Sequence, residues 1–193
     1  MSKIIFLGTP KFAIPILRQL IKSKKEIFAV FTQPPNKSNR GQKIIKSPIQ
    51  KFAEENNLNV KSPTQITKEK KFLVNSKIDL GIVVAYGQLI PSEILKASKH
   101  GFINIHASLL PKYRGAAPIQ RSIINLDQVT GISFMKITEK LDSGPVCNKY
   151  ELNIDKNDNY VSLSDKLSLL GADKIIENIE LILSNNATFI EQE

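Results

Sequence analysis

Short apolar runs alternate along the chain with segments in which apolar residues recur every three or four positions. The runs predict buried strands, and they stand at residues 4–7, 27–32, 80–85 and 102–106. The recurring positions predict a helix over residues 12–21, and the proline after Ser47 predicts the start of another helix. Because this alternation is typical of α/β proteins, we expect one domain over residues 1–193. Its sheet is expected to be mostly parallel, with helices on both faces.

Other segments refine this picture. Residues 131–138 and 146–154 predict two further strands, adjacent and antiparallel, and residues 91–95 predict a short helix. The polar residues 33–47 predict a long loop, and long loops in compact domains are usually functional or mobile. A last helix is expected to start at the S-x-x-D pattern of Ser162 and Asp165. Its expected buried residues are Leu163, Leu167, Leu170, Ile176, Ile179 and Leu183.

The formal net charge of +9 is concentrated in two stretches of the chain. Residues 27–53 and residues 94–126 each contain five basic side chains and no acidic one, whereas the rest of the chain holds 17 basic and 18 acidic residues. A lysine-rich composition accounts for the abundance of basic residues but not for the exclusion of acids. The pattern therefore favours an anionic partner, such as nucleic acid or a polyglutamylated small molecule.

Composition and motifs exclude several classes of protein. The single cysteine, Cys147, rules out an internal disulfide framework and predicts a reducing compartment, so we expect the cytoplasm. No apolar run is long enough to predict a membrane partner, and the opening residues predict a strand and a turn rather than a signal peptide. Residues 8–15 hold one glycine where a dinucleotide-binding turn needs three, and a Walker A sequence is missing. The two histidines, His100 and His106, lack the paired spacing of a metal site, so no metal is expected.

The pair Asn104 and His106 ends the predicted strand over residues 102–106. Because side chains alternate along a strand, both lie on the same face. The carboxyl ends of strands open onto the ligand crevice in α/β sheets, so the pair is a candidate site. Two polar residues that hydrogen-bond to loop backbone at a strand end explain the spacing equally well.

Longer motifs surround this pair. It continues as Ala107-Ser108-Leu109-Leu110-Pro111, and Asp142-Ser143-Gly144 follows further along. Together these motifs resemble the folate-dependent formyltransferase family. Residues 8–13 (GTPKFA) and 83–91 (VVAYGQLIP) are also similar, so the resemblance extends over essentially the whole chain. It implies a Rossmann-like formyltransferase catalytic domain.

The resemblance also implies a mechanism and a cosubstrate. An amine attacks the formyl carbonyl of 10-formyltetrahydrofolate without the help of a metal. Asn104 and His106 are expected to stabilise the resulting oxyanion, while Asp142 orients the imidazole and assists proton transfer. Whether His106 acts chiefly as a base or as an electrophilic donor stays open. The implied folate-binding residues are Ser108, Leu109, Leu110, Pro111, Tyr86 and Gly87.

Residues 114–120 (RGAAPIQ) resemble the branch of the family that formylates the α-amine of initiator methionyl-tRNA in translation initiation. In that branch a basic loop after the second strand approaches the tRNA, which here implies contacts from Arg40, Lys43 and Lys46. Gln42 departs from the basic residue that the family more often has there.

Members of this branch continue into a small C-terminal β-barrel that helps hold tRNA. Because this sequence stops at Glu193, we expect that domain to be absent and activity on tRNA to be weak until it is restored. We expect a monomer. Two alternatives stay open: a sugar-nucleotide N-formyltransferase with the same chemistry, and a noncatalytic folate- or RNA-binding module.

Overall fold

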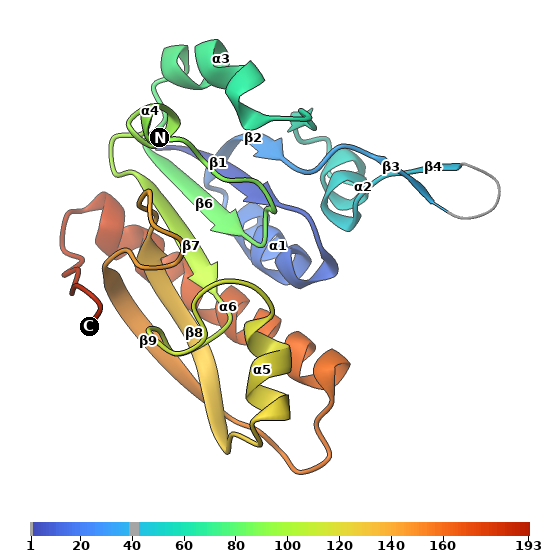
Figure 1. Cartoon of the computed structure of the whole chain (residues 1–193). Helices are drawn as coiled ribbons and strands as arrows, with labels where there is room; N and C mark the ends of the chain where they lie inside the picture. The colour runs from blue at the N-terminus through green and yellow to red at the C-terminus, as the bar shows by residue number, and fades with distance from the viewer. Residues whose placement is uncertain (1, 39–42) are drawn as a thin grey trace.

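A computed structural model describes residues 2–38 and 43–193, and its centre is a seven-stranded sheet (Figure 1). The strand order is β5-β2-β1-β6-β7-β8-β9. The first five strands in this order run parallel, whereas β7 pairs with β8, and β8 with β9, in the antiparallel sense. The strands are β1 (Lys3–Gly8), β2 (Glu26–Phe31), β5 (Val60–Lys61), β6 (Leu80–Val84), β7 (Phe102–His106), β8 (Val129–Lys136) and β9 (Val146–Asn153). The predicted mostly parallel sheet with an antiparallel pair towards its end is confirmed.

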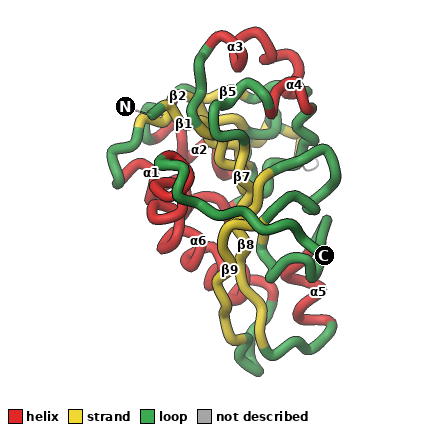
Figure 2. Tube along the Cα trace, turned by 90° about the vertical axis from the view of Figure 1, so that its left-hand side faces the viewer, coloured by secondary structure: helices red, strands yellow, loops and turns green. Residues whose placement is uncertain are grey.

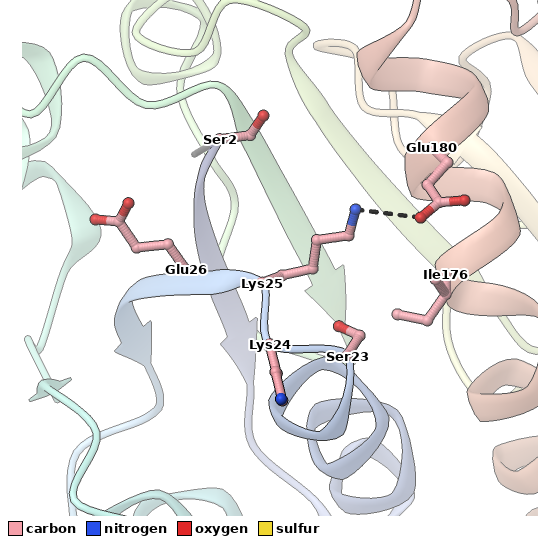
Figure 3. Close-up of a pocket in the computed structure, with 7 residues that line it drawn as sticks. All are labelled: Ser2, Ser23, Lys24, Lys25, Glu26, Ile176 and Glu180. Carbon is pink, nitrogen blue, oxygen red and sulfur yellow. Dashed lines mark hydrogen bonds and ion pairs between the residues drawn. The ribbon is translucent and has the colours of Figure 1, made fainter.

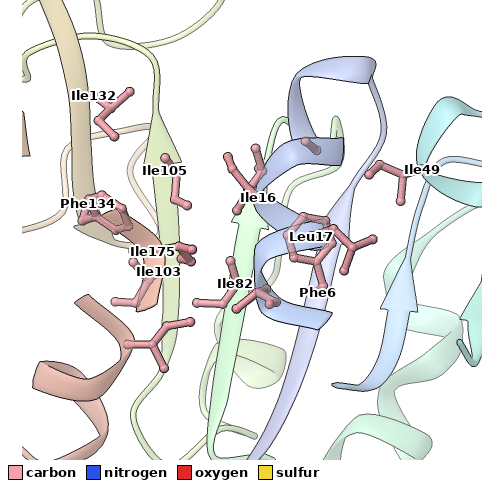
Figure 4. Packing of buried hydrophobic residues seen from close by; sticks show 14 of the residues in the cluster. Phe6, Ile16, Leu17, Ile49, Ile82, Ile103, Ile105, Ile132, Phe134 and Ile175 are labelled. Carbon is pink, nitrogen blue, oxygen red and sulfur yellow. The ribbon is translucent and has the colours of Figure 1, made fainter. Parts of the chain in front are cut away.

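Helices cover both faces of the sheet, as predicted. On one face α1, α2 and α6 pack on alternate strand residues such as Ile103 and Ile105 (Figure 4). On the other face α3 and α4 pack on the intervening residues, such as Phe102. The two-sided burial explains why the central strands are continuous apolar runs. The helices are α1 (Ile14–Lys22), α2 (Pro48–Glu55), α3 (Lys70–Asn75), α4 (Ser92–Leu95), α5 (Pro118–Ile124) and α6 (Tyr160–Leu183), with 3₁₀ turns η1 (Lys11–Ala13) and η2 (Ile66–Glu69).

The segment over residues 33–47 is not simply a long loop. It contains two short antiparallel strands, β3 (Asn36–Ser38) and β4 (Lys43–Ile45), which extend away from the body of the domain (Figure 1). The sequence of β3 is polar, and neither strand shows the alternation that signals a half-buried strand. Ile44 and Ile45 of β4 are exposed, so these two apolar side chains do not pack into a core. The predicted helix start after Ser47 is confirmed, since the Ser47 hydroxyl accepts a hydrogen bond from the Gln50 N–H.

The start of the last helix was predicted one turn too late. Asn159 is the N-cap of α6, and its side chain accepts hydrogen bonds from the N–H groups of Val161 and Ser162. Ser162 sits three positions further on and accepts a hydrogen bond from the Asn159 N–H, which completes a capping box. The pattern at Ser162 thus marked the first turn of the helix rather than its cap.

The buried face of α6 differs slightly from the prediction. Leu163, Leu167 and Ile179 are buried as expected, whereas the other three predicted residues are only partly buried. The residues next to these three, Gly171, Ile175 and Ile182, are buried instead. The small or polar residues Ser168, Gly171 and Asn178 are also buried, which the apolar pattern could not indicate. The buried residues of the helix are Leu163, Leu167, Ser168, Gly171, Ile175, Asn178, Ile179 and Ile182.

Candidate functional site

The site begins at the carboxyl end of β7. Ile103 and Ile105 point into the core on the α1 and α6 side, so Asn104 and His106 face the opposite side of the sheet. β7 is also the strand at which the sheet changes from parallel pairing with β6 to antiparallel pairing with β8. A crevice at the carboxyl ends of strands is where α/β sheets bind ligands. The fold therefore presents both side chains at the edge where chemistry is expected.

Asp142 reaches this pair from the loop that joins β8 to β9. The Asn104 amide donates a hydrogen bond to Asp142 Oδ1 at 3.2 Å, and His106 Nδ1 lies 3.6 Å from Asp142 Oδ2. The Gly115 N–H donates to the same Oδ2 at 2.9 Å, and the Asp142 backbone has a positive φ of 44°. The structure thus brings together the three side chains that the sequence analysis named, although they lie 38 positions apart in the chain.

A backbone carbonyl sets the orientation of the imidazole. His106 Nε2 lies 2.9 Å from the carbonyl oxygen of Tyr113. A carbonyl can only accept, so Nε2 carries the proton of this hydrogen bond. Nδ1, which faces the Asp142 carboxylate at 3.6 Å, is the ring nitrogen that does not take part in this hydrogen bond. The two side chains are only 7% and 15% exposed, so water screens their interaction weakly.

Ser133 of β8 anchors the loop that follows β7 through two hydrogen bonds. The Ser133 hydroxyl donates to the carbonyl of Ser108 at 2.7 Å and accepts from the N–H of Leu110 at 3.0 Å. Ser108 and Leu110 are buried, whereas Leu109 is half-buried and Pro111 is exposed. Of the four predicted folate-binding residues in this loop, two therefore anchor it and two are accessible to a ligand.

The other predicted folate-binding residues follow β6. The side chain of Tyr86 is buried in the core on the α3 and α4 side of the sheet, and burial raises the pKa of its hydroxyl. The Tyr86 carbonyl accepts hydrogen bonds from Thr9 Oγ1 at 2.8 Å and Gln33 Nε2 at 3.3 Å. Gly87 follows with a φ of 85°, a left-handed conformation that favours glycine. Tyr86 therefore supports this turn, and Gly87 gives it its shape.

Tyr113 is a feature of the site that the sequence analysis missed. Its hydroxyl donates to Asp127 Oδ2 and accepts from Asn125 Nδ2, both at 2.8 Å, and Lys112 Nζ bonds the other carboxylate oxygen of Asp127 at 2.8 Å. Burial acts to raise the pKa of Asp127, but the hydrogen bonds from Lys112 and Tyr113 bring it below its ordinary value. These contacts fix the residue whose carbonyl holds His106. A role exercised through the backbone leaves no motif to find.

Two of the three predicted tRNA-binding residues, Lys43 and Lys46, are described, and they lie in or directly after β4 of the β3–β4 hairpin. Arg40 is outside the described residues, and Lys43 begins β4. Lys46 follows the hairpin and forms an ion pair with Glu54 at 2.7 Å, which lowers the pKa of that carboxyl. Glu54 comes directly after the basic stretch 27–53, as Asp127 comes directly after the stretch 94–126. Each basic stretch is thus partly neutralised by an acid just past its end.

Two surface pockets lie apart from Asn104, His106 and Asp142. One, of about 420 Å³, is at the amino ends of β1 and β2, where Lys25 pairs with Glu180 of α6 (Figure 3). The other, of about 320 Å³, includes Gln88 and Leu89, which follow the Tyr86–Gly87 turn. Across residues 2–38 and 43–193, no cluster of three or more histidine, cysteine or acidic side chains could hold a metal ion. Within the same residues no helix combines the length and apolar character needed to cross a membrane.

Comparisons with known proteins show the family of this chain. The family model described as Formyl transferase matches residues 2–179. The chain is 57% identical over its whole length to a protein of Pelagibacter ubique named methionyl-tRNA formyltransferase, and 49% identical over 92% of its length to one of Wolbachia with the same name. It spans 63% and 61% of those relatives, which is about three fifths of their length.

Solved structures with the same fold are also formyltransferases. A phosphoribosylglycinamide formyltransferase from Bacillus halodurans superposes with a TM-score of 0.78 at 20% identity, covering 95% of this chain and 96% of that one. An N-formyltransferase from Helicobacter canadensis, solved with folinic acid and dTDP-3-aminofucose, superposes with a TM-score of 0.77 at 21% identity, covering all of this chain and 68% of that one. At these identities the likeness concerns the fold. The match of the family model over residues 2–179 shows that the chain belongs to the formyl transferase family.

Proposed function

We propose that this chain transfers the formyl group of 10-formyltetrahydrofolate to the α-amine of initiator methionyl-tRNA. The observation that carries the proposal is the meeting of Asn104, His106 and Asp142 at the carboxyl end of β7. The names of the relatives at 57% and 49% identity support the choice of acceptor. The chain spans about three fifths of the length of these relatives, so both substrates belong to the proposal.

Asn104 is the donor that we assign to the developing oxyanion. The carboxylate of Asp142 can only accept, so the nitrogen side of the Asn104 amide must face it. One N–H of this amide is used on Asp142 Oδ1, and the second N–H is the donor for the formyl oxygen when the amine attacks. A fixed amide in a partly buried site stabilises the negative charge without reorganisation, and such donors are typically worth about 10²- to 10³-fold in turnover.

We assign His106 to proton transfer rather than to stabilisation of the oxyanion. Its Nε2–H is already engaged with the Tyr113 carbonyl, so Nδ1 is the position that accepts a proton from the attacking amine, directly or through water. The Asp142 carboxylate stabilises the imidazolium that results. The amine adds to the formyl carbon to give a tetrahedral oxyanion, and the bond from that carbon to N10 of the folate then breaks as the proton that His106 took from the amine passes to N10. This assignment favours the base over the electrophilic role.

We propose that the formyl donor binds along the loop after β7 and the Tyr86–Gly87 turn. Leu109 and Pro111 offer accessible apolar surface, while Ser108, Leu110 and Tyr86 hold the backbone and Gly87 allows close approach. Lys46, Lys43 and Arg40 are proposed to meet the phosphates of the tRNA acceptor end. An amino sugar as acceptor, or binding without turnover, is the competing proposal. The methionyl-tRNA relatives in sequence favour tRNA over the amino sugar.

Transfer of labelled formyl groups tests the proposal. The chain is incubated with labelled 10-formyltetrahydrofolate and, in separate reactions, charged methionyl-tRNA, uncharged tRNA and an amino-sugar nucleotide. We expect label only on methionyl-tRNA, and we expect His106→Ala to reduce turnover by about 10²- to 10⁴-fold while the protein stays folded by circular dichroism. Label on the amino sugar would favour the sugar reading, and folate binding without label on any acceptor would favour a noncatalytic module. Unchanged turnover in His106→Ala would refute the role of the imidazole.

A further inference from the structure

The residues after α6 return to the site rather than leaving it. Ile190 and Val146, the first residue of β9, form an antiparallel bridge in which each N–H donates to the other carbonyl, at 2.9 and 2.8 Å. Figure 2 shows this tail running across the sheet to the chain end. The bridge places the residues that follow beside the loop that carries Asp142.

Gln192 uses its whole amide group at this point. Its Nε2 donates to the carbonyl of Asp142 at 3.0 Å and to the carbonyl of Gly144 at 2.7 Å. Its Oε1 accepts from Arg114 Nε at 2.9 Å, and Arg114 Nη2 donates to the carbonyl of Glu193 at 3.0 Å. One half-buried side chain therefore ties the Asp142 loop to the loop after β7.

Both ends of this tie lead through the backbone to the carboxylate of Asp142. The carbonyl that Gln192 holds belongs to Asp142 itself, whose backbone is in the strained left-handed region. Arg114, which Gln192 also holds, precedes Gly115, whose N–H donates to Asp142 Oδ2. A shift of either loop would move the carboxylate relative to His106 and Asn104.

We propose that Gln192 is a positioning residue that sets Asp142 against His106. This inference rests on the proposed function. It goes beyond the family pattern, because Gln192 lies outside the matched residues 2–179. Gln192 does not touch the reacting atoms. It acts through the backbone of residue 142, and a misplacement of about 1 Å at such a group can lower turnover by about 10²-fold.

Gln192→Glu tests the idea with almost no change of shape. A carboxylate still accepts from Arg114, but it has no N–H for the carbonyls of Asp142 and Gly144 and repels them. We expect kcat for methionyl-tRNA to fall about tenfold or more, with KM for the formyl donor changed by less than about twofold. Gln192→Met lacks the N–H donors and adds no charge. It should likewise lower kcat and leave KM for the formyl donor nearly unchanged. Glu191→Gln, the reverse exchange at the exposed neighbouring residue, is the matched control and should behave as the unsubstituted chain.

A cycle with Asp142 separates positioning from a general effect on stability. If Gln192 acts through Asp142, Gln192→Glu should lower single-turnover transfer less than about twofold in an Asp142→Asn background. The pH profile of kcat should also shift in Gln192→Glu alone. Equal losses in both backgrounds, or a kcat that follows only a lowered melting temperature, would overturn the inference. If the unsubstituted chain transfers no formyl group, the proposed function fails first, and that result is seen before any variant is compared.

Discussion

Each carboxylate oxygen of Asp142 accepts a hydrogen bond from a different donor. Oδ1 accepts from Asn104 and Oδ2 accepts from the Gly115 N–H. An amide at this position must turn its NH₂ towards one of these donors, so Asp142→Asn loses one hydrogen bond and the negative charge that stabilises protonated His106. We expect kcat to fall about 10²- to 10³-fold while KM for the formyl donor changes little. Steady-state kinetics with Ser143→Ala, in the same loop, as the control would measure this, and a purely KM effect would contradict it.

The hydroxyl of Tyr113 gives a second prediction at this scale. Tyr113→Phe removes its hydrogen bonds with Asp127 and Asn125, so the unfolding free energy should fall by about 1 kcal/mol. Turnover should fall a few-fold as well, because the carbonyl of the same residue orients His106. Urea unfolding and kcat are to be compared with Tyr160→Phe, the same change at an exposed tyrosine. Lower stability with unchanged turnover would show that the hydroxyl matters only for folding.

Residue patterns predicted the polar pair of the site but not its supports. Period-two alternation places Asn104 and His106 on one face of a strand, and this inference needs only the local sequence. Tyr113 holds the imidazole through a backbone carbonyl, and Gln192 acts on a loop 50 positions away. Neither effect depends on a residue type at a fixed spacing, so neither leaves a periodic signal. Asp142 itself was found through the family resemblance rather than from its turn-like sequence.

Elements were predicted as well as their apolar patterns allow. The expected bounds of β7 match because a buried parallel strand is a continuous apolar run. The seven-residue helix α5 was missed, since its only cue was Pro118 at the end of a polar loop. The start of α6 was misplaced by one turn, because the capping patterns that begin at Asn159 and at Ser162 overlap and Asn159 is the N-cap.

The start of α6 gives a prediction about pH, because Asp158 lies directly before the N-cap, Asn159. Hydrogen bonds from Lys166, Ser162 and the Asp155 N–H lower the pKa of Asp158 to about 2 from an ordinary value of 3.8. A carboxyl whose folded pKa is depressed contributes stability above its unfolded pKa, and that contribution is lost as the pH falls through the folded value. Asp158→Asn should therefore be less stable than the unsubstituted chain at pH 7, and the gap should close between about pH 4 and pH 2.

Urea unfolding at several pH values would measure this gap. Asp165→Asn, an exposed carboxylate further along α6, is the control for the loss of one charge. A gap that stays constant down to pH 2 would mean that the amide disturbs the helix start sterically, and the ionic account would then be wrong.

Over the whole molecule, the layered α/β fold followed from the alternation of patterns, but the charge distribution was harder to interpret. The two basic stretches looked free of acids in the sequence, whereas folding pairs Lys46 with Glu54 and Lys112 with Asp127. Both acids lie just past the end of a basic stretch, so linear windows overstate the field that a partner meets. The hairpin nevertheless projects from the body, where a polyanion can reach it (Figure 1).

This arrangement predicts how salt affects tRNA binding. If Arg40, Lys43 and Lys46 each meet one phosphate, log K for methionyl-tRNA should fall with log salt with a slope of roughly −2.1 to −2.7, so that a fourfold rise in salt weakens binding roughly 20- to 40-fold. Lys46→Ala should reduce the slope by about 1.

Glu54→Gln should tighten binding, because it releases Lys46 from its ion pair and removes a negative charge beside the hairpin. Glu55→Gln, one position further along, removes the same charge without touching that ion pair. Filter binding over a range of salt would measure these slopes, and a larger gain in Glu55→Gln than in Glu54→Gln would mean that bulk charge, rather than the freeing of Lys46, governs the interaction.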